Sequence, residues 1–214
     1  MKNKFKTVDK SQKAKQKRQQ PLFPHGDWIA IVMGVAVLSQ MDGMGHHLGH
    51  AGIFFLMLAL IARPIRGFWQ QPLKHRRAIG IFAFAATLAH AIYAFCNVLN
   101  CDPKVILDMT SRHQWGIWAG IISLAIITPA AVTSFRFFQQ KLGRKWRQIH
   151  LLSVPALALA VLHTVLIGPH YLAQFQIEML DHLRTYAIVI MTFLVLLVRR
   201  KIFWSILRFL KIIN

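Results

Sequence analysis

The sequence predicts an all-α protein, a polytopic membrane bundle of six helices, and three observations support this fold class. Hydrophobic residues make up 55% of the 214-residue chain and charged residues only 15%, whereas a soluble domain has about 25% charged residues. The apolar residues lie in runs close to the ~20 residues that a membrane-spanning helix needs. Lys and Arg gather in clusters separated by loops that hold few of them, as the positive-inside rule requires.

The elements follow in order along the chain. Residues 1–26 form a basic, Pro-containing tail in which eight of the first 18 residues are Lys or Arg, and we expect this tail to be disordered and cytoplasmic. The remainder, residues 27–214, is expected to be the six-helix domain. Its predicted spans are 28–40, 49–65, 78–98, 114–135, 147–169 and 184–204. The first of them has the shortest apolar core.

The distribution of charge fixes the expected topology. Five basic residues lie in 63–77, five in 136–147 and five after residue 198. These loops and both chain ends are therefore predicted to face the cytoplasm. The three other loops face outward and hold five of the seven acidic residues, Asp42, Asp102, Asp108, Glu178 and Asp181. The net charge of +19 is then explained by topology and by attraction to anionic lipid, so we expect no nucleic-acid partner.

Three histidines lie at membrane depth: His90 in the third span, and His150 and His163 in the fifth. A buried hydrogen bond between helices would explain one such residue. Proton relays normally recruit carboxylates, and the predicted spans contain none. Several histidines without a carboxylate or thiolate favour axial ligation of haem iron.

Counting residues places these histidines at two depths. His90 lies thirteen residues after Arg77, or about 20 Å from the cytoplasmic edge, and His163 lies sixteen after Arg147, or about 24 Å. The third and fifth spans run in the same direction, so these two side chains are expected to hold one haem from opposite faces, nearer the outer side. His150 lies only about 4–5 Å in and suits a second, inner haem.

Two difficulties accompany this prediction. Thirteen residues at about 100° each leave His150 and His163 roughly 140° apart around an ideal helix. Pro155 lies between them and is able to kink or rewind the helix. An inner haem also needs a second ligand, and His75, the one nearby histidine on the third span's side, is either that ligand or an interfacial residue.

Two segments resemble a known family. They are "KHRRAIGIFAFAATLAHAIYAF" and "AAVTSFRFFQQKLGRKWRQIHLLSVPALALAVLHTVLIG", which are similar to the two histidine-containing segments of the ferric-reductase-like transmembrane family. The resemblance covers about residues 45–210. Within the family, the pattern is most similar to the haem-binding membrane subunits of bacterial methionine-sulfoxide reductase systems. It implies a six-helix bundle of the cytochrome b type, with one or two haem b groups on His90, His150 and His163.

The resemblance also implies partners. It points to an electron-transfer subunit, rather than a complete enzyme, that takes electrons from the quinone pool or a cytoplasmic flavin reductase, with flavin mononucleotide as a further cofactor. The expected acceptor is a periplasmic molybdopterin sulfoxide reductase. The chain has no Walker motif or dinucleotide fingerprint, so we expect no nicotinamide domain of the usual kind. Basic residues near the inner end are either partners of haem propionates or a flavin phosphate, or positive-inside anchors: Arg76, Arg77, Arg144 and Arg147.

Two features of the outer side stay open. The segment "MDGMGHHLGHAG" offers side chains that suit copper or another metal, namely Met41, Met44, His46, His47 and His50. It is either a docking site for an external metal ion or a flexible turn, and His46 has the best claim to a functional contact. Cys96 and Cys101 flank the outer end of the third span and form either a structural disulfide or two inert thiols.

Two other functions compete with the electron-transfer subunit. The first is a direct transmembrane reductase of ferric or cupric ions that uses the outer His/Met segment. The second belongs to another class, a non-haem metal transporter or assembly factor. It predicts metal-dependent flux and no haem spectrum, and the absence of carboxylates from the predicted spans counts against it.

Overall fold

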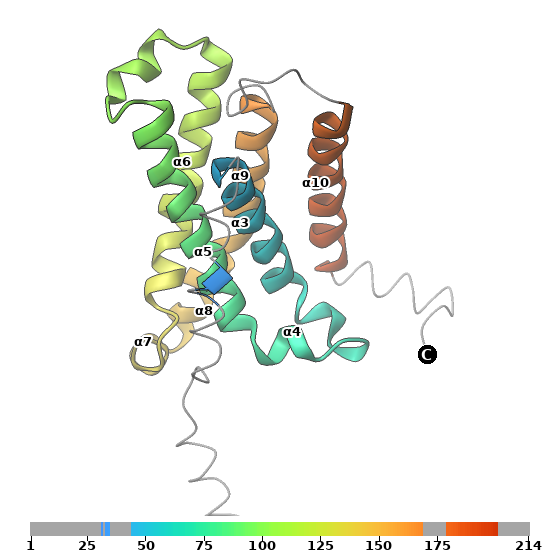
Figure 1. Ribbon diagram of the computed structural model, residues 1–214. Helices are drawn as coiled ribbons and strands as arrows, with labels where there is room; N and C mark the ends of the chain where they lie inside the picture. Colours follow the sequence, from blue (N-terminus) through green and yellow to red (C-terminus); the bar gives the residue numbers. More distant parts are fainter. Residues whose placement is uncertain (1–30, 32, 35–43, 169–178, 201–214) are drawn as a thin grey trace, which may run out of the picture.

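The computed structural model describes residues 31, 33–34, 44–168 and 179–200. Its regular elements over these residues are all helical (Figure 1), and the described part of the chain contains no strand. The predicted all-α class is therefore confirmed. The basic tail, 1–26, lies outside the described residues, and so does most of the first predicted span, of which Ile31, Met33 and Gly34 are helical.

The described elements run in the following order. The first is α3 (Met44–Ile61), followed by a 3₁₀ turn (Pro64–Gly67) and the short α4 (Gln71–Lys74). Next come α5 (Arg76–Tyr93), a π turn (Ala94–Val98), a 3₁₀ turn (Pro103–Asp108) and α6 (Ser111–Val132). The last are α7 (Arg136–Leu142), α8 (Arg144–Leu151), α9 (Ser153–Ile167) and α10 (Met179–Val198).

Three of these stretches are long and apolar enough to cross a membrane: Arg76–Val98, Ser111–Val132 and Arg144–Ile167. Two shorter apolar helices cover Gly45–Ile61 and His182–Val198. These five segments correspond to the second to sixth predicted spans, each beginning two to five residues earlier than predicted. Because three, and not six, described helices meet the length for spanning, the count of six stays a prediction.

The bundle is built from two closely packed helix pairs, α3 with α5 and α6 with α9. Small residues allow the close approach. Ala83 of α5 and Ala156 of α9 have no exposed surface, and a Cβ atom added to Gly52 of α3 would lie 2.3 Å from Thr87 Oγ1 of α5. Between membrane helices, where burial from water supplies little driving force, such close backbone packing is a main source of association energy.

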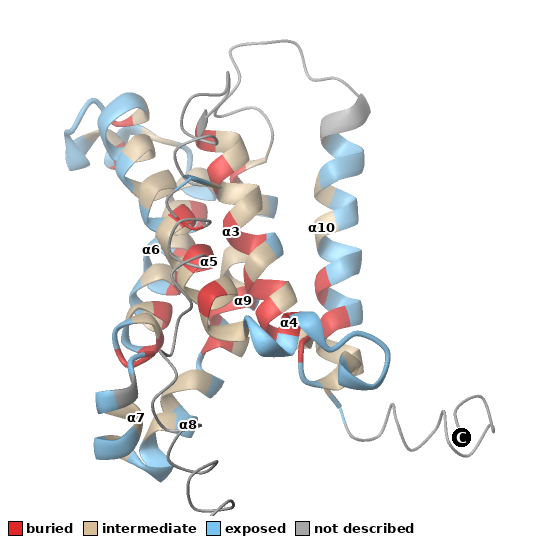
Figure 2. Ribbon diagram, turned by 60° about the horizontal axis from the view of Figure 1, so that its bottom comes forward, coloured by how far each residue is buried: buried red, intermediate tan, exposed pale blue. Residues whose placement is uncertain are grey.

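The last helix, α10, lies at the side of the bundle (Figure 1) and most of its surface is exposed (Figure 2). Its exposed side chains are largely apolar and include Leu183, Tyr186, Ile190 and Phe193. Val195 is buried against the core, and Thr192 Oγ1 lies 3.5 Å from Met57 Sδ of α3. In a transmembrane protein an apolar face of this kind is the surface that lipid chains cover.

The bundle has two chemically different ends. The helices α4, α7 and α8 lie at one end (Figure 1). Together with residues 63–67, 76–77 and 199–200 they carry 12 of the 15 described Lys and Arg residues. Trp146 of α8 fixes this end to α6, because its Nε1 donates to the Thr133 carbonyl over 2.8 Å. The turns over 94–110 lie at the opposite end (Figure 1). That this basic end faces the cytoplasm stays a prediction from the positive-inside rule.

The fifth predicted span is interrupted one residue after the end of α8. The N–H of Leu152 donates to the carbonyl of Ile149 over 3.1 Å, a three-residue spacing that tightens the backbone relative to an α-helix. Pro155 is the third residue of α9, a position where a helix does not need its N–H. The chain therefore rewinds at Leu152 instead of bending around the proline.

Candidate functional site

Two histidines meet between α5 and α9. The ring centroids of His90 and His163 lie 6.1 Å apart and the ring planes are inclined by 79°. The residues are 73 positions apart in the sequence, so only the packing of the bundle brings them together. Both side chains are partly buried. This pair is one of the two parts of the candidate site.

Each of the two rings is held by a backbone carbonyl. His90 Nδ1 lies 2.7 Å from Gly45 O, and His163 Nδ1 lies 2.8 Å from Gly116 O. A carbonyl oxygen only accepts, so both Nδ1 atoms donate, and in the neutral ring the lone pair is then on Nε2. Histidines that bind metals are usually held in this way, with the other ring N–H on a backbone carbonyl or carboxylate.

Glycines make room for both rings. A Cβ atom on Gly49 would lie 3.1 Å from His90 Nδ1, and one on Gly120 would lie 2.7 Å from His163 Nδ1. In each case the glycine stands four residues after the one whose carbonyl accepts from the ring. Two Gly-x-x-x-Gly pairs, one on α3 and one on α6, therefore provide an equivalent seat for each histidine.

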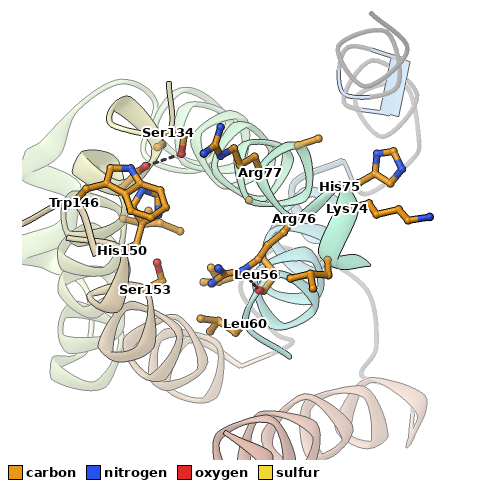
Figure 3. A pocket seen from close by; sticks show the side chains of 17 residues that line it. Leu56, Leu60, Lys74, His75, Arg76, Arg77, Ser134, Trp146, His150 and Ser153 are labelled. Atoms are coloured by element: carbon orange, nitrogen blue, oxygen red, sulfur yellow. Dashed lines mark hydrogen bonds between the residues drawn. The ribbon is translucent and has the colours of Figure 1, made fainter. Parts of the chain in front are cut away.

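A cavity of about 360 Å³ lies toward the basic end of the bundle, lined by α3, α5, α6, α8 and the first residue of α9. Its volume is within the range of sites for small molecules and cofactors, roughly 300–1,000 Å³. The wall combines apolar side chains with a few polar ones (Figure 3). The polar and aromatic residues of the wall are Lys74, His75, Arg76, Arg77, Ser134, Trp146, His150 and Ser153.

His150 is the histidine of this cavity. Its ring packs on Trp146, with centroids 4.2 Å apart. Its Nε2 atom is buried and has no hydrogen-bond partner. A buried polar atom without a partner costs about 1–3 kcal/mol, so a ligand that binds Nε2 would remove this penalty. His150 lines the cavity while His163 lies beside His90, so the two histidines of the fifth predicted span belong to different parts of the site, as their different faces on an ideal helix allow.

The arginines proposed from sequence divide into two groups. Arg76 and Arg77 line the cavity; Arg76 Nε donates to Ala59 O over 2.8 Å, and Arg77 donates to Gln139 and lies 6.0 Å from the Trp146 ring. Arg144 and Arg147 are exposed and are not part of the cavity wall. Of the four arginines, only Arg76 and Arg77 are thus placed beside a cavity that could hold an anionic group, and the role of each in binding a propionate or a phosphate stays a prediction.

His75 also lies on the cavity wall but is exposed. Figure 3 places it across the cavity from His150, beside Lys74. Of the two alternatives for His75, a ligand of an inner haem or an interfacial residue, this exposed position is more consistent with the second.

The outer histidine segment is helical where it is described. Residues 44–50 form the first turns of α3 and not a loop, which corrects the sequence-based expectation; Met41 lies outside the described residues. The His46 ring lies 4.0 Å from that of His50 and 5.9 Å from that of His47, centroid to centroid. Over the described residues, no three or more His, Cys, Asp or Glu side chains are grouped so as to hold a metal ion.

Sequence reasoning missed the residues that hold the rings. Gly45, Gly49 and Gly116 escape attention individually because a glycine at a helix interface is explained by packing alone. The available signal was the repeated spacing of four, Gly45 to Gly49 and Gly116 to Gly120, in the two helices that face the histidine-bearing spans. Trp146, whose ring packs on that of His150, was also missed as a residue of the site.

Comparison with known proteins identifies the family. The sequence profile of the ferric reductase like transmembrane component matches residues 48–161. Three similar proteins are named protein-methionine-sulfoxide reductase heme-binding subunit MsrQ. The one from Agrobacterium fabrum is 33% identical over 163 residues, 67% of this chain and 73% of that protein. The one from Rhodospirillum rubrum is 33% identical over 132 residues, 60% and 62% of the two chains. The one from Brucella anthropi is 34% identical over 123 residues, 56% and 55% of the two.

The matched part of this chain thus spans little more than half of the length of two of these relatives. No solved structure matches the chain. The family profile nevertheless covers 114 of the 214 residues, including α5, α6 and most of α3 and α9. His90 lies inside the matched range, and His163 lies two residues beyond its end. The chain therefore belongs to the ferric reductase-like transmembrane family.

Proposed function

We propose that this chain is a haem-binding membrane subunit of a methionine-sulfoxide reductase system, similar to MsrQ, and that it carries electrons across the bacterial inner membrane. The observation that supports it most is the arrangement of His90 and His163. Both rings are fixed through Nδ1, both present Nε2 as a free acceptor, and their centroids lie 6.1 Å apart.

The spacing fits a shared metal ion. Two imidazoles that bind one metal from opposite sides have centroids about 6 Å apart, because each metal–nitrogen bond is about 2 Å and each ring nitrogen lies about 1 Å from its centroid. Gly49 and Gly120 let the two rings lie directly against the helix backbones, which helps to fix the orientation of both imidazoles. Haem b supplies one-electron chemistry when it is bound. His90 and His163 would be its axial ligands and would hold its orientation.

The inner cavity fits a second group of the same kind. His150 provides a buried Nε2 atom without a partner, and Arg76 and Arg77 provide positive charge on the same wall. These residues would hold a second haem b or the isoalloxazine and phosphate of flavin mononucleotide, with the arginines paired to propionates or phosphate. The cavity is at the basic, cytoplasmic end, which is where electrons from the quinone pool or a flavin reductase would enter.

The proposed acceptor is a periplasmic molybdopterin sulfoxide reductase of the MsrP type. This assignment follows from the similarity to the MsrQ subunits together with the orientation, in which the His90–His163 pair is at the outer end. Both chain ends are then cytoplasmic, and the chain is an electron-transfer subunit whose partner performs the chemistry on methionine sulfoxide.

Absorption spectroscopy of the purified full chain tests the haem sites. We expect a low-spin bis-histidine spectrum for the parent protein. His90→Ala and His163→Ala should each remove the signal of the haem proposed between these two residues and reduce haem affinity by at least about tenfold. His182→Ala is the matched control, because this histidine is exposed on α10 and lies outside both sites. If both variants of the pair keep the full spectrum and haem content of the parent, the proposed ligation is wrong.

A second experiment tests the direction and the partner. The chain is reconstituted in liposomes, a quinol or reduced flavin is supplied on one side, and reduction of an MsrP-type protein is followed on the other. Electron transfer to ferric or cupric ions without that protein would favour the direct metal reductase. Metal flux without any haem spectrum would favour the transporter.

A further inference from the structure

The two cysteines of the chain come together at the outer end of α5. The helix ends in a π turn in which the N–H of Leu99 donates to Ala94 O over 3.1 Å, and the N–H of Cys101 donates to Phe95 O over 2.9 Å. The second of these hydrogen bonds joins residues six positions apart, so the chain folds back against the end of the helix. It brings the Cys101 thiol into hydrogen-bonding contact with the Cys96 thiol.

The backbone holds this return in an uncommon conformation. Asn100 and Cys101 have φ angles of 50° and 58°, the only non-glycine residues with positive φ in the described part of the chain. Left-handed backbone is uncommon for residues with a Cβ atom. Leu99, between the cysteines, is buried, so the turn is anchored on the bundle. Both cysteines are exposed and free of a disulfide.

We propose that Cys96 and Cys101 form a reversible dithiol–disulfide pair that exchanges with external disulfides and thiols, and not a permanent structural bridge. This pair lies at the end of α5 opposite to Arg76 and Arg77, the non-cytoplasmic end by the positive-inside rule, where disulfides form and persist. Exposed or strained disulfides are the labile ones. A loop with only four intervening residues also gains little entropic stabilisation from being closed.

Exchange proceeds in two steps, which either exposed thiol is able to begin. The hydrogen bond with Cys96 raises the pKa of the Cys101 thiol above its ordinary value, and the steps that follow take Cys96 as the attacking thiol. The Cys96 thiolate attacks a sulfur of an external disulfide such as oxidised glutathione, forms a mixed disulfide and releases one glutathione thiolate. Cys101 then loses its proton, attacks the Cys96 sulfur and releases the second glutathione thiolate. Two thiols are oxidised, one disulfide is reduced, and the two protons end on the released thiols.

Thiol labelling of the full chain in detergent tests the proposal, since the chain holds no other cysteine. The reduced protein should accept two maleimide groups. After treatment with oxidised glutathione it should accept none and be lighter by two hydrogens, and reduced glutathione should restore both sites in the folded protein. In a parallel experiment, oxidised thioredoxin replaces oxidised glutathione. Faster formation of the Cys96–Cys101 disulfide with thioredoxin would identify a protein disulfide as the external oxidant.

The single variants check that both thiols are needed for closure. Cys101→Ser and Cys96→Ser should each stop at a glutathione adduct, because neither keeps the second thiol that would release glutathione and close the disulfide. Thermal unfolding of both variants verifies that they fold. Two thiols that each take up glutathione without closing, or that stay free, would overturn the proposal. A bridge that resists reduced glutathione until the protein is unfolded would overturn it too, because the bridge would then be structural. None of these readouts depends on haem.

Discussion

Replacing Gly120 with alanine should weaken haem binding while leaving the helix that carries it at least as stable. The added Cβ would lie 2.7 Å from His163 Nδ1, whereas ordinary contacts begin at 3.4 Å. The ring must therefore move by about 0.7 Å, the difference between these distances. Such a shift stretches the 2.8 Å bond between Nδ1 and Gly116 O to about 3.5 Å, beyond the normal range of hydrogen bonds.

The magnitude follows from the kind of contact that is lost. Loss of a hydrogen bond that orients a metal-binding histidine typically weakens metal affinity about 10–100-fold, or about 1.4–2.7 kcal/mol. The change from glycine to alanine inside a helix acts in the opposite direction and stabilises the fold by about 1 kcal/mol. A lower affinity therefore cannot be explained by unfolding if the haem-free variant melts at or above the parent's temperature.

The assay is titration of the haem-free protein with hemin, followed by Soret absorbance, together with thermal unfolding of the same samples. Gly67→Ala is the matched control, because nothing lies within 4 Å of its added Cβ and it is outside both sites. If Gly120→Ala binds hemin within about twofold of the parent, then the glycine does not hold the ring in place and the proposed seat for His163 is refuted.

Further predictions concern the inner cavity and the core. His150→Ala should lower bound cofactor at the inner site while the His90–His163 spectrum persists, and equal loss of both signals would contradict two separate sites. Arg77→Gln should weaken binding of the inner group by about tenfold, whereas the exposed Arg144→Gln should change it by less than about twofold; equal effects would contradict the cavity assignment. Leu157→Ala, at a fully buried side chain, should destabilise the protein by about 2–5 kcal/mol in denaturant unfolding. Ser123→Ala removes the 2.7 Å bond to Ala156 O and should destabilise it by about 0.6–1.7 kcal/mol; no change in either variant would contradict the packing of α6 on α9.

The part of the site that depends on depth could be predicted from the sequence. Counting residues from the basic cluster at each span's inner end placed His90 and His163 at similar depth, and the structure brings their rings to 6.1 Å. This works because rise per residue is nearly constant in a helix and the membrane fixes where basic residues stop. The role of Gly120, by contrast, depends on which side chain lies opposite it, and this is a matter of packing between helices.

The part that depends on rotation could not be predicted. An ideal helix leaves His150 and His163 on different faces, and the interruption at Leu152 depends on the three-residue hydrogen bond to Ile149, which no residue type dictates. The same holds for Arg77 and Arg144, which the sequence treats alike although one lines the cavity and the other is exposed. The contact between Cys96 and Cys101 depends on positive φ at Asn100 and Cys101, and neither residue is a glycine.

The stretch Arg144–Ile167 is one apolar membrane-length helix with a single tightened turn at Leu152, so the direction of each imidazole is set by its residue count along that helix. Within α9, deletion of one residue between Leu152 and His163 would turn the imidazole by about 100° and shift it by about 1.5 Å, away from both His90 and Gly116. A substitution at those positions changes neither the turn nor the rise. The alignment of the two imidazoles therefore depends more on how many residues separate them than on which residues these are. A substitution elsewhere cannot restore the alignment that a deletion removes.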